Sequence, residues 1–236
     1  MDHLFFSPHI ENGLARLDEE ESRHLLAVLR RQAGDTLQIT DGRGSFYEAE
    51  IVETGKKHAV ARILNTTLTP EPPARLHVAI APTKQIERFE WFLEKATEVG
   101  IQEITPLLCQ RSERTSIRHD RLEKILTSAM KQSWQSRLPR LNPLTPLRDC
   151  VQKAAEPRRL IAWIAETPSP YFKTKLQESA DTLILIGPAG DFSPEEVDFA
   201  QKCGFSSVSL GPSRLRTETA GLMVVMGFNF LLVQDE

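Results

Sequence analysis

Cysteine is scarce in this chain, and the three that occur lie far apart. Cys109, Cys150 and Cys203 are odd in number and follow no paired-cysteine or His/Cys spacing. This pattern argues against a disulfide framework and predicts buried free thiols. The six histidines are scattered and form no pair at helical spacing, so we expect no metal site.

Long apolar runs are missing as well. The longest, from Ala220 to Val233, is interrupted by Gly221, Gly227 and Asn229. It is shorter than the ~20 residues that a helix needs to cross a bilayer. The first six residues lack the basic start and the long apolar run of a secretory signal. We therefore expect a cytoplasmic protein with no transmembrane helix and no membrane partner.

Positive charge is not in excess over the whole chain, because the net charge is −3. This argues against a polybasic nucleic-acid binder. The distribution is uneven, however, and residues 110–140 carry eight bases against three acids. This local excess is typical of a surface that neutralises RNA phosphates. An ordinary solvated helix face is the alternative.

What the chain does contain is typical of a globular protein, with 40% apolar and 26% charged residues. One boundary is visible at Pro70-Glu71-Pro72-Pro73. This stretch cannot continue a helix or a central strand, because proline fixes φ and removes a backbone donor. Since the pattern of the chain changes across it, we predict two domains, residues 1–72 and 73–236.

Short alternating segments before the boundary predict a small β-barrel. The expected strands are residues 36–40, 46–52 and 59–64, with a turn at Asp41-Gly42-Arg43-Gly44. One short helix is expected between Glu19 and Arg31, where the apolar residues follow a helical spacing. Small barrels of this kind often bind nucleic acid, although a fold alone does not establish a function.

After the boundary, apolar strands alternate with helical patterns. The expected strands are 76–81, 104–108, 160–165, 183–186 and 208–210, and the expected helices are 87–99, 118–134 and 194–203. Such alternation predicts an α/β domain with a mostly parallel sheet covered by helices. Ligands of these sheets sit beyond the carboxyl ends of the strands, so the loops there are candidates for a binding site.

Two of those loops follow adjacent strand patterns. The first contains Glu166 and Thr167, and the second is Gly187-Pro188-Ala189-Gly190-Asp191 before a helix that Ser193 and Glu196 begin as a capping box. Glycines let the backbone approach a ligand, but a tight turn needs them equally. The spacing is not that of a phosphate-binding loop or a dinucleotide fingerprint. A nucleotide phosphate is therefore not the expected ligand.

The third loop carries most of the expected chemistry. The stretch from Leu210 to Ala220 sets charged and hydroxyl side chains directly against the apolar segment that follows. Burying unpaired charge is expensive, so these groups must be either paired or used. A helix start with paired charges is the alternative to a catalytic site.

The second and third loops, placed at the end of an α/β half behind a small barrel, resemble those of the SPOUT RNA methyltransferases. Within that class the resemblance is to the small-subunit (16S) ribosomal RNA uracil-N3 methyltransferases, and it extends over essentially the whole chain. Further stretches that carry it are His24 to Arg30, Gly34-Asp35, Asp41-Gly42, Glu94 to Ile101, Ile104 to Leu107, and Lys131-Gln132-Ser133 with Arg137 and Pro139.

The resemblance implies a PUA-like β-barrel that binds RNA, followed by an α/β domain tied in a trefoil knot. It also implies that the knot loops bind S-adenosylmethionine and that the enzyme is a homodimer with its site at the subunit interface. The implied cofactor-binding residues are Glu166, Thr167, Ile186, Gly187, Gly190, Leu210, Gly211 and Leu215. The apolar run after Ala220 agrees with a dimer, because a helix that is apolar all round needs cover. A central core helix of a monomer has the same pattern.

The expected catalytic residues are Arg216, Glu218 and Thr219. Arg216 would stabilise the charge that develops on the uracil carbonyl oxygens. Glu218 would accept the N3 proton or orient a water that does, and a carboxylate favoured by the helix dipole is the alternative. Thr219 would orient the substrate or cap the helix.

The substrate that the resemblance implies is 16S rRNA of the small ribosomal subunit. The expected RNA contacts are Arg30, Arg111, Arg114, Lys131, Gln132 and Arg137. Because N3 lies on the Watson–Crick edge of uracil, the target base must be flipped or single-stranded.

The chain departs from the family in both knot turns. Ala189 and Asp191 stand where the family usually has glutamate and glycine, and Ser213 and Arg214 stand where it usually has arginine and an aliphatic residue. Two other functions therefore stay open. One is a knotted methyltransferase that acts on a ribose hydroxyl or on tRNA, and the other is a non-catalytic RNA-binding assembly factor, which Ala189 favours.

Overall fold

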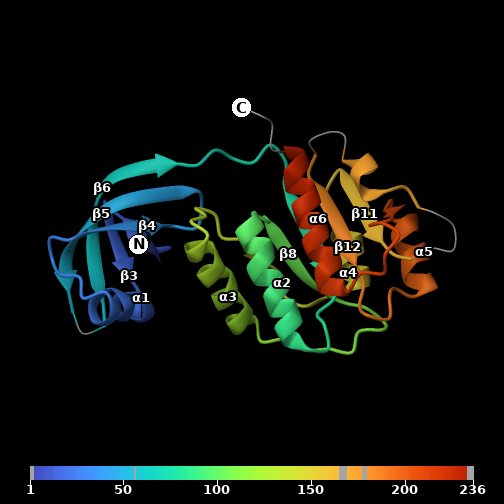
Figure 1. Ribbon diagram of the computed structural model, residues 1–236, viewed down its shortest axis with the longest axis horizontal. Coiled ribbons are helices and arrows are strands. Elements are labelled where there is room, and N and C mark those ends of the chain that lie inside the picture. The colour runs from blue at the N-terminus through green and yellow to red at the C-terminus, as the bar shows by residue number, and fades with distance from the viewer. Residues whose placement is uncertain (1–2, 56, 165–168, 177–179, 233–236) are drawn as a thin grey trace. The chain divides into compact units, whose positions relative to one another are not determined.

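The computed structural model describes residues 3–55, 57–164, 169–176 and 180–232 (Figure 1). The chain divides into two compact units. The first is Met1–Glu71 together with Thr127–Leu138, and the second is Pro72–Leu126 together with Pro139–Glu236.

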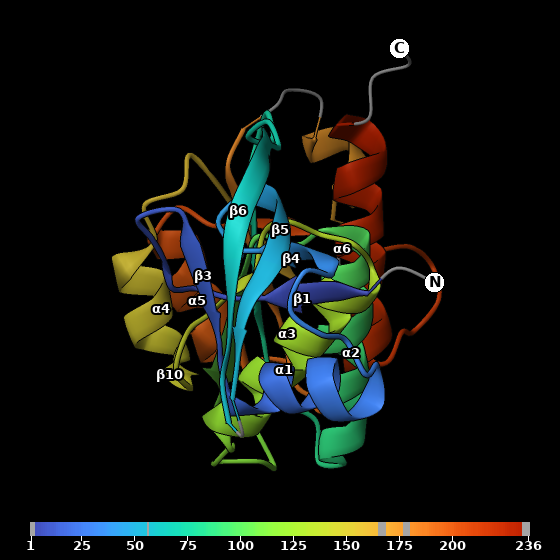
Figure 2. The ribbon, with the colours of Figure 1, turned by 90° about the vertical axis from the view of Figure 1, so that its left-hand side faces the viewer.

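The first unit is built on a six-stranded sheet. Its strands are β1 (Leu4–Phe6), β2 (Ile10–Glu11), β3 (Leu14–Leu17), β4 (Thr36–Thr40), β5 (Ser45–Thr54) and β6 (Ala59–Leu68). Their spatial order is β1-β4-β5-β6-β3-β2, and Figure 2 shows the middle of this order. The pair β1 and β4 is parallel, and the other pairs are antiparallel.

The sheet closes on itself because of how its edge strands are connected. β1 and β2 lie at opposite ends of the spatial order, yet only residues 7–9 separate them in the chain. A link of this length spans no more than roughly 14 Å. The edge strands β1 and β2 must therefore lie close together. Ser7 joins them, since its N–H donates to Thr40 O (2.9 Å) and its hydroxyl donates to Arg16 O (2.7 Å). The predicted small barrel is confirmed.

The helix expected between Glu19 and Arg31 is shorter than predicted. α1 (Glu19–Arg23) begins at Asp18, whose carboxylate accepts a hydrogen bond from Glu21 N (2.8 Å). It continues as the π-helix η1 (His24–Val28) and ends before Arg30, which has a left-handed backbone (φ 57°). Leu25 of η1 is fully buried and packs this turn against the core of the barrel.

The second unit is built on a seven-stranded sheet in which every pair is parallel. Its strands are β7 (Leu76–Ile80), β8 (Glu103–Leu108), β9 (Arg140–Leu141), β10 (Thr145–Pro146), β11 (Arg158–Ala162), β12 (Thr182–Ile186) and β13 (Ser206–Val208). The order is β10-β8-β7-β12-β11-β13, with β9 also paired to β8. The predicted parallel α/β sheet is confirmed.

Five α-helices accompany this sheet in sequence. They are α2 (Ile86–Val99), α3 (His119–Gln132), α4 (Leu147–Lys153), α5 (Pro194–Lys202) and α6 (Thr217–Leu232), with a short 3-10 helix η2 (Phe172–Lys175) after β11. The last residues of α3 belong to the first unit. The capping box predicted for α5 is present, because Ser193 and Glu196 exchange hydrogen bonds with each other's backbone N–H.

The central strands β7 and β12 bury both of their faces, as parallel strands between helices do. Alternate residues such as Ala79 and Leu185 point into a core shared with α4 and α5. The other face meets α2 and α6, which lie side by side (Figure 1). Gly221 of α6 makes this contact possible, since a Cβ there would come within 2.7 Å of both Ile80 and Phe92.

The chain order of the last strands is unusual. β12 returns between β7 and β11, and β13 then lies outside β11 at the edge of the sheet. From that edge the chain comes back to α6, which packs on α2, β7 and β12. The loops after β11, β12 and β13 are therefore brought together at the end of the chain.

Two of the three cysteines are buried free thiols, as predicted, and Cys203 is partly exposed. Burial raises the pKa of Cys150 to about 12 and raises that of Cys109 further. Within the described ranges, no helix combines the length and the apolar character needed to cross a membrane.

Candidate active site

A cavity of about 710 Å³ lies at the carboxyl ends of the parallel strands in the second unit. Its walls come from the loops after β7, β8, β11, β12 and β13 and from the start of α6. These loops gather at one edge because all the strands run in the same direction. The volume is within the range of small-molecule sites. The strand-end loops chosen from the sequence thus share one cavity.

The turn from Gly187 to Asp191 forms one part of the wall. Asp191 has a left-handed backbone (φ 60°), which aspartate tolerates better than most residues. Its carboxylate accepts hydrogen bonds from Ile164 N (3.0 Å) and from Phe192 N (2.8 Å). Asp191 therefore ties the loop after β12 to the loop after β11.

The loop after β13 forms another part of the wall and is held by the segment before η2. Ser209 N–H donates to Pro170 O, and Phe172 N–H donates to Ser209 O, both at 2.9 Å. Gly211 follows with φ 123°, and a Cβ there would lie 3.1 Å from the Tyr171 hydroxyl. Both the backbone angle and the close approach of Tyr171 require glycine at this position.

The start of α6 joins these loops and carries two charged groups of the cavity. The buried Thr217 hydroxyl donates to Gly187 O (3.1 Å), which links α6 to the turn after β12. Glu218 is buried and has Arg88 Nε of α2 3.9 Å from its carboxylate. Arg216 is exposed to solvent in the cavity wall.

Most of the expected cofactor-binding residues line this cavity. Those in its wall are Ile186, Gly187, Leu210, Gly211 and Leu215. Gly190 is not in the wall, and its carbonyl accepts a hydrogen bond from Arg111 Nη1 (2.8 Å). Glu166 and Thr167 lie outside the described residues.

The expected catalytic residues are divided. Arg216 and Glu218 line the cavity, whereas Thr219 is exposed on α6 and does not contribute to the wall. Thr217, two residues earlier, is the threonine that faces the cavity. Two positions along an α-helix turn a side chain by about 200° around the axis, so Thr217 and Thr219 point in nearly opposite directions, and the catalytic role of Thr219 stays a prediction.

Two of the expected RNA contacts brace the loops of the cavity. Arg111 Nη1 donates to the carbonyls of Gly190 (2.8 Å) and Phe192 (3.3 Å). Arg114 donates from Nε to Thr83 O (3.1 Å) and from Nη2 to Lys84 O (2.7 Å). These guanidinium groups therefore hold the backbone of the cavity loops in place. RNA binding by them stays a prediction.

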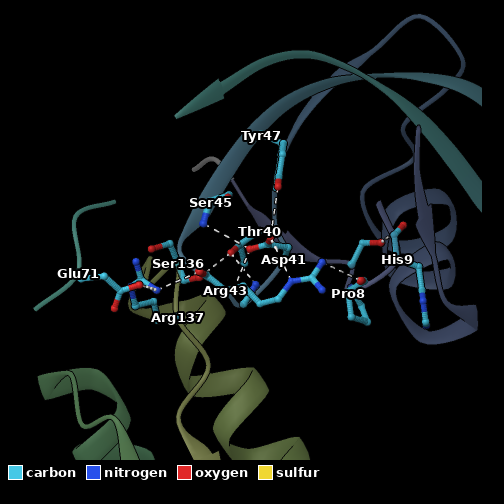
Figure 3. A network of polar contacts seen from close by, with 12 residues as sticks. Pro8, His9, Thr40, Asp41, Arg43, Ser45, Tyr47, Glu71, Ser136 and Arg137 are labelled. Carbon is cyan, nitrogen blue, oxygen red and sulfur yellow. Dashed lines mark hydrogen bonds and ion pairs between the residues drawn. The ribbon is translucent and has the colours of Figure 1, made fainter. Parts of the chain in front are cut away.

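The other expected RNA contacts belong to the first unit. Lys131 pairs with the buried Glu21, whose pKa is raised by burial in spite of that lysine. Arg137 donates to Arg43 O and to Thr69 O, both at 2.9 Å, and pairs with Glu71 (Figure 3). Arg30 and Gln132 are exposed.

Sequence reasoning missed three residues that the fold brings to this site. Arg88 comes from α2, Tyr171 from the segment before η2, and Thr217 from the start of α6. No local pattern marks any of them, because each acts through a neighbour that is distant in sequence.

The second unit encloses a ligand-sized cavity between its returning loops and is joined in one chain to a small β-barrel, as expected for the SPOUT class of RNA-modifying enzymes. A model of the RNA methyltransferase domain matches residues 70–228, and a model of the RNA methyltransferase PUA domain matches residues 17–64. The chain belongs to this family of RNA methyltransferases.

Similar proteins span nearly the whole chain. The structure of a probable rRNA-methyltransferase from Porphyromonas gingivalis is 43% identical, with a TM-score of 0.89 and 98% of both chains covered. That of a ribosomal RNA small subunit methyltransferase E from Neisseria gonorrhoeae, bound to S-adenosyl methionine, is 26% identical, with a TM-score of 0.84 and 98% of both chains covered. The ribosomal RNA small subunit methyltransferase E of Synechocystis is 30% identical over 92% of this chain and 73% of its own length.

These comparisons confirm the predicted fold class. The α/β unit has the trefoil-knot (SPOUT) fold, and the barrel is PUA-like. The expectation that the chain is an RNA methyltransferase is confirmed with it.

Asp191→Ala should lower the free energy of unfolding by about 2 kcal/mol, because it removes two hydrogen bonds and leaves alanine with a left-handed backbone. Urea denaturation measures this change. Asp191→Gly is the matched control. This variant loses the same two hydrogen bonds, but glycine adopts the left-handed backbone without strain. Equal losses in the two variants would show that the backbone conformation carries no cost.

Lys131→Met should lower the free energy of unfolding by about 2 kcal/mol, because it leaves Glu21 buried without its partner. The partial exposure of Lys131 keeps the loss below that of a fully buried pair. The double variant Glu21→Gln with Lys131→Met should recover most of the loss in the same denaturation experiment. A double variant as unstable as the single one would contradict the pairing argument.

Proposed function

We propose that this protein transfers a methyl group from S-adenosylmethionine to N3 of a uridine in 16S rRNA of the small ribosomal subunit. The observation that carries the proposal is the single cavity in which the loops after β11, β12 and β13 meet Arg216 and Glu218. The names of the relatives, which are small subunit rRNA methyltransferases, support the choice of substrate.

The chemistry of the cavity wall fits S-adenosylmethionine. Ile186, Val208 and Leu210 offer apolar surface to an adenine ring, and charged side chains of both signs line the rest of the wall. Gly187 and Gly211 present backbone without a side chain. These glycines, with Ile186, Leu210 and Leu215, would hold the cofactor, which supplies an electrophilic methyl group when bound.

Arg216 is our candidate for stabilising negative charge on the uracil carbonyl oxygens. Its guanidinium lines the cavity, and it forms no ion pair or side-chain hydrogen bond within the part of the chain that the structure describes. A donor that is already in place when charge develops costs no reorganisation, and this makes it effective in catalysis.

Glu218 is our candidate for taking up the N3 proton, directly or through a water. Its carboxylate is buried in the cavity wall, close to the guanidinium of Arg88. A general base in this position must face the substrate nitrogen, and the cavity is where the loops would present the methyl donor. The first turn of α6 also favours a carboxylate through the helix dipole, and this remains the alternative role of Glu218.

We propose that residues 1–72, with which residues 127–138 form one compact unit, serve as the RNA-binding domain, and that the rest of residues 73–236 serve as the methyltransferase domain. Such a division separates phosphate contacts, which give affinity, from the pocket that receives one base. The target uridine must leave any base pair before N3 can be reached. A ribosomal substrate also agrees with a location in the cytoplasm.

We also infer that a second copy of the chain covers α6. One side of this helix packs on α2 and β7. Another side leaves Met226, Phe230 and Leu231 exposed at 41%, 74% and 51% of their surface. Large apolar side chains gathered on one helix are typical of a protein interface.

Arg216→Ala should reduce the rate of methyl transfer to small-subunit rRNA about 100- to 1000-fold, because it removes a donor to the developing charge. Affinity for S-adenosylmethionine, measured by calorimetry, should change little. Thr219→Ala tests the third expected catalytic residue and should keep full activity, since Thr219 is not among the residues that line the cavity.

Mass analysis of the nucleosides identifies the product of this reaction. The proposal requires 3-methyluridine, and it would be overturned by a methylated ribose or by a mark in tRNA alone. Absence of both methylation and cofactor binding would favour an assembly factor. Unaltered turnover of Arg216→Ala would remove this residue from the mechanism.

Phe230→Glu should convert a dimer into a monomer, because it places a charge within the apolar side of α6 that the second copy covers. Light scattering coupled to size-exclusion chromatography gives the mass of each variant. Leu68→Glu, at a position 75% exposed on β6, should leave the mass unchanged. A wild-type protein that is monomeric at micromolar concentration would refute the interface.

A further inference from the structure

Helix α3 ends in a motif that normally requires glycine. Gln135 N–H donates to Met130 O (3.0 Å), and Trp134 N–H donates to Lys131 O (3.3 Å). These are the two hydrogen bonds of a Schellman cap, whose left-handed residue is usually glycine. Here that residue is Trp134, with φ 55°. A bulky side chain in this conformation is a backbone outlier that the surrounding structure must hold in place.

The side chain of Trp134 is only partly buried, so packing in the core does not by itself explain its backbone conformation. The residue keeps 44% of its surface exposed, and its indole N–H has no hydrogen-bond partner within the described ranges. Asp191, which has a similar backbone, offsets the cost with two hydrogen bonds that its own carboxylate accepts. Trp134 combines the same backbone conformation with a large, partly exposed aromatic ring and has no such side-chain hydrogen bond within the described residues.

The segment that follows Trp134 is fixed to the barrel. Gly44 N–H donates to Ser136 O (2.9 Å), and Leu138 N–H donates to Gly42 O (2.8 Å). The Arg137 side chain adds bonds to two further carbonyls, and Figure 3 shows how it reaches across this turn. Trp134 is thus held between the end of α3 and a clamped loop. The backbone that carries the ring is therefore already ordered when a partner arrives.

Three cations that lie near Trp134 in the chain or across this turn each have an acidic partner. Lys131 pairs with Glu21, and Arg137 pairs with Glu71. Arg43, which lies opposite Arg137 in an antiparallel bridge, pairs with Asp41. The positive charge of these three side chains is therefore partly neutralised within the protein. The feature that a nucleic acid would use is the flat, exposed ring, because unpaired bases stack on aromatic side chains.

We propose that Trp134 is a stacking platform for an unpaired base of the RNA substrate. This inference rests on the proposed function, since it takes RNA to be the substrate. Because the backbone of Trp134 is held on both sides, only its side-chain rotamer remains to be fixed when a base covers the ring. Stacking is also tolerant of sequence, so Trp134 contributes affinity rather than choice of the target nucleotide.

The test measures binding of a fluorescently labelled ten-nucleotide oligouridylate to the full-length protein. Trp134→Leu and Trp134→Gly should bind ~5- to ~150-fold more weakly than wild type, the range expected for one lost base stack. Trp134→Phe keeps an aromatic ring and should retain most of the affinity. The slope of log affinity against log salt should be the same in all variants, because no phosphate contact is lost.

A stability measurement separates stacking from a purely structural role. Trp134→Gly should melt at a higher temperature than Trp134→Ala, because both variants lose the packing of the indole and only glycine adopts the left-handed backbone without strain. A Trp134→Gly variant that is fully folded at the assay temperature and still binds RNA more weakly cannot owe that loss to unfolding. A Trp134→Gly variant that melts no higher than Trp134→Ala, or Leu and Gly variants that bind as tightly as wild type, would overturn the inference.

Methylation of 16S rRNA transcribed in vitro tests the proposed function separately. A wild-type enzyme that methylates, with an unchanged KM in Trp134→Gly, would sink the stacking role alone. A wild-type protein that binds oligouridylate through Trp134 but methylates no RNA would sink the proposed function alone. A wild-type protein that does not bind oligouridylate at all would contradict the stacking role of Trp134.

Discussion

The shared direction of the seven strands in the second unit is the constraint on which the site depends. Parallel strands place every carboxyl end at one edge, and their crossovers must pass over the faces of the sheet. Both faces of β7 and β12 are therefore buried, and the polar groups of the chain are left to the loops at the edge. Thr217 and Asp191 then bond these loops to one another, so that one cavity has walls from segments far apart in sequence.

Much of the positive charge in the middle of the chain is used inside the molecule. Arg111, Arg114 and Arg137 donate to backbone carbonyls of loops, which otherwise have few hydrogen-bond partners. A planar guanidinium suits this role because it offers several donors in a fixed geometry. Counting bases in the sequence therefore overstates the number of guanidinium groups that are free to hydrogen-bond RNA phosphates.

Among the described residues, four other than glycine have a positive φ, namely Asn12, Arg30, Trp134 and Asp191, and the compensation for this conformation differs among them. Asp191 takes a left-handed conformation and stabilises it with its own carboxylate. Gly211 takes such a conformation without cost and makes room for Tyr171. Trp134 has neither advantage, and its exposed aromatic ring is what distinguishes it from Arg30, which also has a left-handed backbone.

The sequence by itself determined the elements whose signals are local. Alternation predicted the strands of the barrel and of the parallel sheet, and the Ser193 capping box predicted the start of α5, because both depend on neighbouring residues. The motifs also led to the family and to the loops of the cavity. Only the tertiary structure decided that Thr217 rather than Thr219 faces the cavity, that Arg88 approaches Glu218, and that residues 127–138 belong with the barrel. These contacts depend on how distant elements pack, and no local pattern encodes that.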